Sequence, residues 1–131
     1  MIAIMVVAHS PLASALVDTA RYVLGRDPET TAIDVLPNEC AVDCSALLAK
    51  RILDADQGDG VLVLTDLPGA SPANIASAAS HLARADGIPC CVLGGVNESM
   101  LLRAINYRQG NLDDVATSAL AGATQALLRV D

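Results

Sequence analysis

Four short apolar runs, separated by longer segments with a helical pattern, constrain the fold of this chain more than any other feature. The clearest is "GVLVLTD", which is apolar at almost every position before its last two residues. A continuous apolar run of this length indicates a strand that is buried on both faces, as in a parallel sheet. Strands are predicted over Ala3–Val7, Ala32–Leu36, Gly60–Thr65 and Pro89–Leu93.

Amphipathic helices are predicted between and after these strands, because apolar residues recur there at intervals of three or four. Ser10 is a favourable N-cap for the first helix, and Pro11 suits its first position. The alternation of strand and helix predicts an α/β fold, with a doubly wound, mostly parallel sheet covered by helices on both faces. The predicted stripes and caps are Leu12, Leu16 and Val23 ending at Gly25; Cys44, Leu48 and Ile52; Ile75, Ala79 and Leu82 ending at Gly87; Leu101 and Ile105 capped by Asn97; and Leu112 to about Ala121 capped by Asn111.

The composition fits a single domain over residues 1–131 and disfavours several functions. Aromatic residues make up only 2% of the chain, so the core must consist of Leu, Val, Ile and Ala. A net charge of −7 argues against nucleic-acid binding and is compatible with a partner that presents a basic face. The sequence shows no basic leader and no apolar run of membrane-spanning length, so we expect a cytoplasmic protein without membrane insertion.

The cysteines are expected to be reduced and structural. Cys40 and Cys44 lack the usual spacing of a zinc site, and Cys90 and Cys91 are adjacent in a predicted strand, so they point to opposite faces. Free cysteines most often serve as small buried apolar residues, which is the interpretation favoured here. No cluster of metal ligands is evident, and no cofactor is expected.

Two segments share one plan, an apolar strand followed by a polar residue and then by a Ser-Pro pair. They are "VVAHSPLA", in which His9 ends the strand, and "VLTDLPGASPAN", in which Asp66 does. The first and third strands of a doubly wound sheet are commonly neighbours at the ligand-binding crevice. We therefore expect His9 and Asp66 to face each other there, with helix N-termini near Ser10 and Ser71 pointing into the crevice.

This pair suggests phosphoryl chemistry. A carboxylate that accepts the N–H of an imidazole fixes its tautomer and makes the other ring nitrogen a better nucleophile. Helix N-termini bind phosphate, and the hydroxyls of Ser71, Ser10 and Thr65 are further candidates to hold it. No nucleotide-binding loop is present, which favours a phosphorylated protein as donor.

Structural roles are the alternative for each polar residue. Asp66 can simply cap a loop, and Ser-Pro pairs are ordinary helix starts. His81 is predicted to be a solvated surface residue. Asn97 either caps its helix, which we favour, or lies near the crevice.

Three stretches resemble the enzyme IIA component of the mannose-type (fructose/mannose/sorbose) sugar phosphotransferase system. They are "IAIMVVAHSPLASAL", "GDGVLVLTDLPGASPANIA" and "GVNESMLLRAI", in the family's order and over most of the chain. The resemblance implies that His9 accepts a phosphoryl group from the phosphocarrier HPr and passes it to an enzyme IIB partner. It implies that Asp66 supports His9 and that Ser71 helps to hold the phosphoryl group. It also implies a homodimer that exchanges a C-terminal strand, for which "ALLRVD" is the candidate.

Departures from the family pattern leave other roles open. The usual glycine after the histidine is Ser10, the usual Phe-Gly-Gly is Pro68-Gly69-Ala70, and the phenylalanine after the Ser-Pro pair is Ala73. No IIB domain follows within this sequence, so we expect either a separate IIB protein or a regulatory target that binds according to the phosphorylation of His9. The phosphotransferase subunit of dihydroxyacetone kinase is a related alternative. The tail after Gly122 can also continue the last helix instead of forming a strand.

Overall fold

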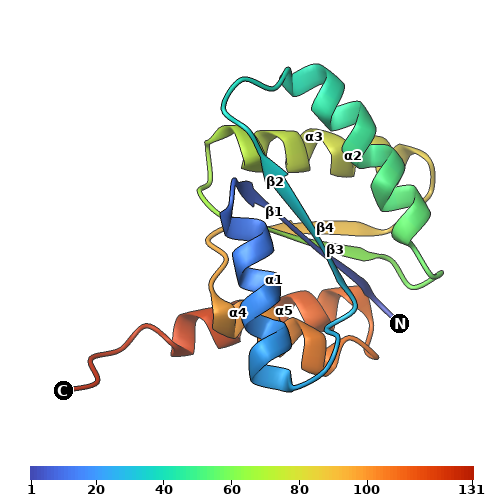
Figure 1. Cartoon of the computed structure of the whole chain (residues 1–131). Helices are drawn as coiled ribbons and strands as arrows, with labels where there is room; N and C mark the ends of the chain where they lie inside the picture. Colours follow the sequence, from blue (N-terminus) through green and yellow to red (C-terminus); the bar gives the residue numbers. More distant parts are fainter.

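A computed structural model describes the whole chain, residues 1–131, as alternating strands and helices (Figure 1). The strands pair in parallel in the order β2-β1-β3-β4, which confirms the predicted α/β fold and places β1 beside β3. In chain order the elements are β1 (Ala3–His9), α1 (Leu12–Leu24), β2 (Thr30–Val35), α2 (Ala41–Ala55), β3 (Val61–Thr65), α3 (Ser71–Ala85), β4 (Cys90–Leu93), α4 (Glu98–Tyr107) and α5 (Leu112–Gln125).

Helices cover both faces of the sheet, as the apolar strands require. Helices α1, α4 and α5 lie on one face, and α2 and α3 lie on the other (Figure 1). Alternate residues of β1 enter the two cores: Ile4 and Val6 pack toward α1, while Met5 and Val7 pack toward α2 and α3. The central strands β1 and β3 are therefore buried on both sides, and their carboxyl ends are fixed relative to each other.

The start of α1 differs from the prediction. Ser10 is not the N-cap, because the helix begins at Leu12 and no side chain at the capping position accepts a hydrogen bond. Instead, Asp34 in β2 accepts the Ser14 amide at 3.1 Å and also bonds the Ser14 hydroxyl. A carboxylate from the neighbouring strand thus satisfies a free N–H of the first turn. The predicted stop at Gly25 is confirmed, with a φ of 69°.

Two predicted helix stripes are partly wrong. On α1 the buried residues are Ala13, Val17 and Ala20, whereas Leu12 and Val23 are exposed. On α3, Ile75 and Ala79 are buried as predicted, but Ala83 takes the place expected for Leu82. Alanine faces allow a helix to approach the sheet closely, so the larger side chains on the adjacent stripe remain outside. The caps at Asn97 and Asn111 are confirmed, since each side chain accepts an amide of the first turn.

The C-terminal segment forms no strand within this single chain. Helix α5 continues to Gln125, and residues 126–131 extend away from the body of the molecule (Figure 1). Leu127, Leu128 and Val130 are all exposed there. Exchange of this segment between two chains remains a prediction.

Of the cysteines, only Cys90 is fully buried, and all four are free. Cys90 and Cys91 contact opposite cores, as predicted. The prediction that the cysteines are buried is wrong for Cys40, which is exposed at the N-cap position of α2. Cys44 is half-buried and donates to Glu39 at 2.9 Å; this bond, with burial, raises the thiol pKa to about 11. No helix has the combination of length and hydropathy needed to span a membrane.

Arg108, for which the sequence suggested no role, joins three segments of the fold. Its buried guanidinium donates to the carbonyls of Ile2 at 3.0 Å, Pro28 at 2.9 Å and Glu29 at 3.1 Å. It thereby holds the end of α4 against the start of β1 and the α1–β2 loop.

Replacement of Arg108 by methionine is expected to lower the free energy of unfolding by about 2–4 kcal/mol, because carbonyl groups lose their buried donor. Urea denaturation followed by circular dichroism measures the change. The control is Arg26→Met, an exposed arginine, for which we expect a change within about 0.5 kcal/mol. An Arg108→Met midpoint equal to that of the wild type would contradict a structural role for these bonds.

Candidate functional site

His9 and Asp66 meet at the carboxyl edge of the sheet. His9 is the last residue of β1, and Asp66 directly follows β3, the strand paired with β1. One carboxylate oxygen, Asp66 Oδ2, accepts the backbone amide of His9 at 3.0 Å and contacts the ring nitrogen His9 Nδ1 at 2.6 Å. The double contact fixes both the position and the rotation of the imidazole ring.

The two side chains have different environments. The Asp66 side chain is 12% exposed, whereas that of His9 is 52% exposed. Burial by itself would raise the pKa of Asp66, but the hydrogen bonds from the amide and ring of His9 outweigh it and hold this pKa below its ordinary value. Because an ionised carboxylate only accepts hydrogen bonds, Nδ1 must carry the proton. Nε2 is then the nitrogen with a free lone pair, on an accessible ring.

The other predicted site residues lie at the same edge but make no hydrogen bond to His9. Ser10 follows it directly and donates its amide to the Val35 carbonyl at 3.0 Å. Ser71 is the exposed first residue of α3, a helix with no side-chain cap, so amides of its first turn are unpaired. Thr65 is buried, and its hydroxyl has no partner.

The β4–α4 loop holds the backbone at Asp66 through hydrogen bonds. The sequence analysis did not predict this role. Gly95 donates its amide to the Asp66 carbonyl at 2.7 Å, and Val96 donates to that of Thr65 at 3.0 Å. A Cβ atom on Gly94 would lie 2.8 Å from Cγ of Pro68, so only glycine allows this approach. The adjacent pair Gly94-Gly95 after a strand was the available signal.

Two further predictions are confirmed as structural. The Asn97 side chain accepts the Met100 amide at 2.9 Å, which makes it a helix cap. His81 is exposed on α3, where its ring contacts Arg84. The structure gathers no group of three or more His, Cys, Asp or Glu side chains that could hold a metal ion.

Three exposed leucines lie at the same edge of the sheet as His9. Leu12 begins α1, Leu36 follows the strand residue paired with His9, and Leu67 follows Asp66. Their exposed fractions are 39%, 55% and 62%. Exposed apolar side chains that gather at one edge often mark a protein-docking surface.

The acid sensitivity of folding should depend on Asp66. Its pKa is lower in the folded chain than its ordinary value of 3.8, so the ionised carboxylate stabilises the fold above that pH and loses its contribution as pH falls through the folded pKa. We expect Asp66→Asn to be less stable than the wild type at neutral pH, and the difference to narrow below about pH 4. Urea titrations at several pH values measure it. A constant difference would show that the ionised form makes no special contribution.

The fold and the site together define a parallel α/β domain with a histidine held by a buried carboxylate at the carboxyl edge of its sheet. A family model described as the PTS system fructose IIA component matches residues 3–120. The chain belongs to that family of the phosphotransferase system.

The transcriptional regulatory protein LevR of Bacillus subtilis (strain 168) is 31% identical to this chain over 121 residues. That match covers 89% of this chain and 12% of LevR, so the chain spans only a small part of that relative. The phosphotransferase system component EIIA of Streptococcus agalactiae superposes with a TM-score of 0.86 at 25% identity, covering 98% of this chain and 97% of that one. The mannose/sorbose specific IIA subunit of Enterococcus faecalis has the same fold, with a TM-score of 0.87 at 21% identity over 99% and 95% of the two chains.

Proposed function

We propose that this chain is a phosphohistidine carrier that accepts a phosphoryl group on Nε2 of His9. The observation that carries the proposal is the 2.6 Å contact between His9 Nδ1 and the buried Asp66 carboxylate. In the neutral imidazole this contact places the proton on Nδ1 and the free lone pair on Nε2, and the side chain is half-exposed, as a nucleophilic imidazole needs.

In the proposed reaction, Nε2 attacks the phosphorus of a phosphohistidine on the donor protein. A bond forms between Nε2 and phosphorus as the bond between phosphorus and the donor's ring nitrogen breaks, and the donor imidazole leaves with that electron pair. The His9 ring becomes positively charged, and the Asp66 carboxylate beside Nδ1 offsets this charge. In the next transfer, a nucleophile of the acceptor attacks the phosphorus, and His9 Nε2 is the leaving group that keeps the electron pair.

The phosphoryl oxygens are expected to bind at the start of α3. Unpaired amides at a helix N-terminus donate hydrogen bonds and carry partial positive charge. The Ser71 hydroxyl lies at that terminus, the Ser10 hydroxyl follows His9, and the Thr65 hydroxyl lacks a partner. These groups would replace the water that solvates the phosphoryl group before transfer.

The proposed donor is HPr, and the proposed acceptor is a separate IIB protein. The exposed side chains of Leu12, Leu36 and Leu67, at the same edge of the sheet as His9, would give such partners apolar contacts. The net charge of −7 favours partners with a basic face and disfavours nucleic acid. We also propose that the chain acts in the cytoplasm as a homodimer, with the exposed segment 126–131 exchanged between subunits.

A regulatory role is the second candidate, and the match to LevR favours it. In that case the phosphorylation of His9 changes binding to a target protein instead of feeding a sugar permease. Both candidates share the same first step, so both require phosphorylation of His9.

The first test is phosphotransfer from radiolabelled phosphoenolpyruvate through enzyme I and HPr of the same organism. We expect acid-labile label on this chain only when both proteins are present. Addition of a IIB protein then separates the candidates, because a relay loses its label to IIB whereas a regulatory switch retains it. A folded chain that takes up no label would contradict both.

A further inference from the structure

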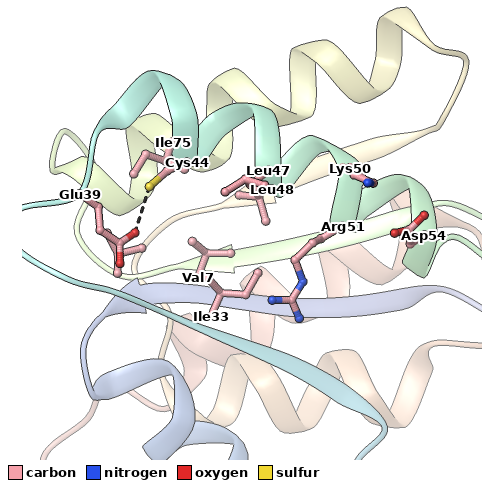
Figure 2. A pocket seen from close by; sticks show the side chains of 11 residues that line it. Val7, Ile33, Glu39, Cys44, Leu47, Leu48, Lys50, Arg51, Asp54 and Ile75 are labelled. Carbon is pink, nitrogen blue, oxygen red and sulfur yellow. Dashed lines mark hydrogen bonds between the residues drawn. The ribbon is translucent and has the colours of Figure 1, made fainter.

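A groove lies between α2 and the strands β1 and β2 (Figure 2). The proposed phosphotransfer makes no use of it. Its volume is about 450 Å³, which is within the range of small-molecule sites. The apolar side chains that line it come from the sheet and from α2 and α3; they include Val7, Ile33, Val35, Leu47, Leu48 and Ile75.

The groove exists because β2 is an edge strand. Helices α2 and α3 pack over the central strands, where Val7 and Val63 are fully buried. On β2 the corresponding residue Ile33 is only half-buried, and Leu47 of α2 is 65% exposed. Of the apolar side chains that line the groove, Ile33 and Leu47 are therefore left partly exposed, whereas Val7, Val35, Leu48 and Ile75 are buried.

One cation crosses this space. The Arg51 side chain descends from α2 toward the strands, whereas Lys50 stays at the level of the helix (Figure 2). Arg51 makes no hydrogen bond or ion pair in the structure, although Asp54 lies one turn along the same helix. At the far end, the Glu39 carboxylate is already engaged by the Cys44 thiol and the Leu36 amide. Lys50 and Asp54 also line the groove without an ion pair, and of these three charged groups the Arg51 guanidinium is the one that extends over the strands (Figure 2).

A second hollow continues the groove past this guanidinium. It has a volume of about 220 Å³, shares Arg51 and Asp54 with the first, and reaches Met5 and Thr31. Arg51 therefore stands over an elongated channel, with apolar walls on the Cys44 side. From Cys44 to Arg51 the helix rises about 10 Å, which gives the length of the apolar part.

We propose that this groove binds a small amphipathic carboxylate. Its alkyl chain lies on the floor formed by Ile33, Val35 and Leu48, and its carboxylate pairs with the Arg51 guanidinium. The apolar floor supplies affinity through burial, and the planar guanidinium selects an anionic head group of matching geometry. This site goes beyond the proposed carrier role and requires no phosphotransfer.

The test uses decanoate as the probe and the amide chemical shifts of the isotope-labelled chain as the readout. We expect saturable shifts at Ile33, Val35 and Leu48. Decanol, which lacks the charge, and butyrate, which lacks the long chain, are expected to bind more weakly than decanoate.

Variants that change single charges on α2 test whether the carboxylate of decanoate is attracted by the positive charge of Arg51. Arg51→Gln is expected to weaken decanoate binding roughly tenfold, because a charge-assisted hydrogen bond is lost. Asp54→Asn is expected to strengthen binding about twofold, because a like charge is removed. Lys50→Gln is the matched control and should change binding less than Arg51→Gln. All three positions are exposed, so the fold is expected to survive.

Three results would overturn the proposal: no shifts at millimolar decanoate, equal responses to decanol and decanoate that Arg51→Gln leaves unchanged, or shifts of the groove residues that depend on protein concentration alone. The last would mean that a second copy of the chain fills the groove. None of these results bears on His9, because phosphoryl uptake is measured separately.

Discussion

Replacement of His9 by alanine is expected to abolish phosphoryl uptake completely. The imidazole is the nucleophile of the proposed reaction, and its Nδ1 lies 2.6 Å from the supporting carboxylate oxygen Asp66 Oδ2. Alanine has no atom that can form the bond to phosphorus, so no slower route through the same residue exists. Labelling from phosphoenolpyruvate through enzyme I and HPr measures the loss. His9→Ala removes the ring bond to Asp66 but keeps the bond from the residue 9 amide, so we expect a modest fall in melting temperature and a folded variant.

The chain offers a matched control, because it contains only two histidines. His81→Ala removes the other imidazole, which is exposed on α3 and contacts Arg84 instead of a carboxylate. We expect this variant to be labelled as fully as the wild type. Retention of acid-labile label by His9→Ala, together with its loss in His81→Ala, would move the phosphorylation site and refute the proposed mechanism.

The phosphorylated wild type also tests which ring nitrogen reacts. Nδ1 faces Asp66, so phosphorylation there would break the contact that holds the ring. We therefore expect the phosphoryl group on Nε2, and nitrogen chemical shifts of the labelled imidazole distinguish the two positions.

The site could be predicted from the sequence because it depends on local patterns at the ends of two strands. His9 and Asp66 each follow a short apolar run, and strand–helix alternation makes β1 and β3 parallel neighbours. Parallel pairing brings the two carboxyl ends to one edge whatever the details of helix packing. The meeting of these residues therefore follows from the pairing of β1 with β3, which is common in doubly wound sheets.

Features that depend on packing could not be predicted in the same way. Both Leu12 and Ala13 belong to apolar stripes on α1, and only the close approach of the helix decides that Ala13 is buried. Arg108 binds carbonyls of Ile2 and Pro28, which are far away in the sequence, so no local pattern reveals it. An arginine that satisfies backbone groups looks the same in a sequence as one on the surface.

The groove beside α2 also could not be predicted from the sequence. Ile33 and Val35 alternate with other residues of β2 as they would under a covering helix, and the sequence predicted helices on both faces of the sheet. The position of β2 at the edge of the sheet leaves Ile33 half-buried beside the groove, whereas Val35 is buried. Whether a strand lies at the edge or in the centre of a sheet depends on strand order. The pattern of apolar residues in one strand does not reveal this order.

Replacement of Asp66 by alanine is the second change with a large expected effect. The carboxylate holds the proton on Nδ1, fixes the ring through a second bond to the His9 amide at 3.0 Å, and offsets the charge that develops on transfer. Loss of a carboxylate that orients a histidine in this way typically costs a factor of about 10²–10⁴ in rate. We expect Asp66→Ala to slow transfer from HPr roughly 10²-fold or more, measured by rapid quench under single-turnover conditions.

The size and character of this effect separate a functional from a structural role for Asp66. An exposed carboxylate at the other end of the sheet, Asp59, provides the control, and Asp59→Ala should transfer at the wild-type rate. If Asp66 acts on the chemistry, the variant still becomes labelled at His9 after long incubation, because the nucleophile is present. If Asp66 only holds the fold together, the loss of rate would instead follow the loss of folded protein, and lowering the temperature would restore it. A wild-type rate in folded Asp66→Ala would remove the carboxylate from the mechanism.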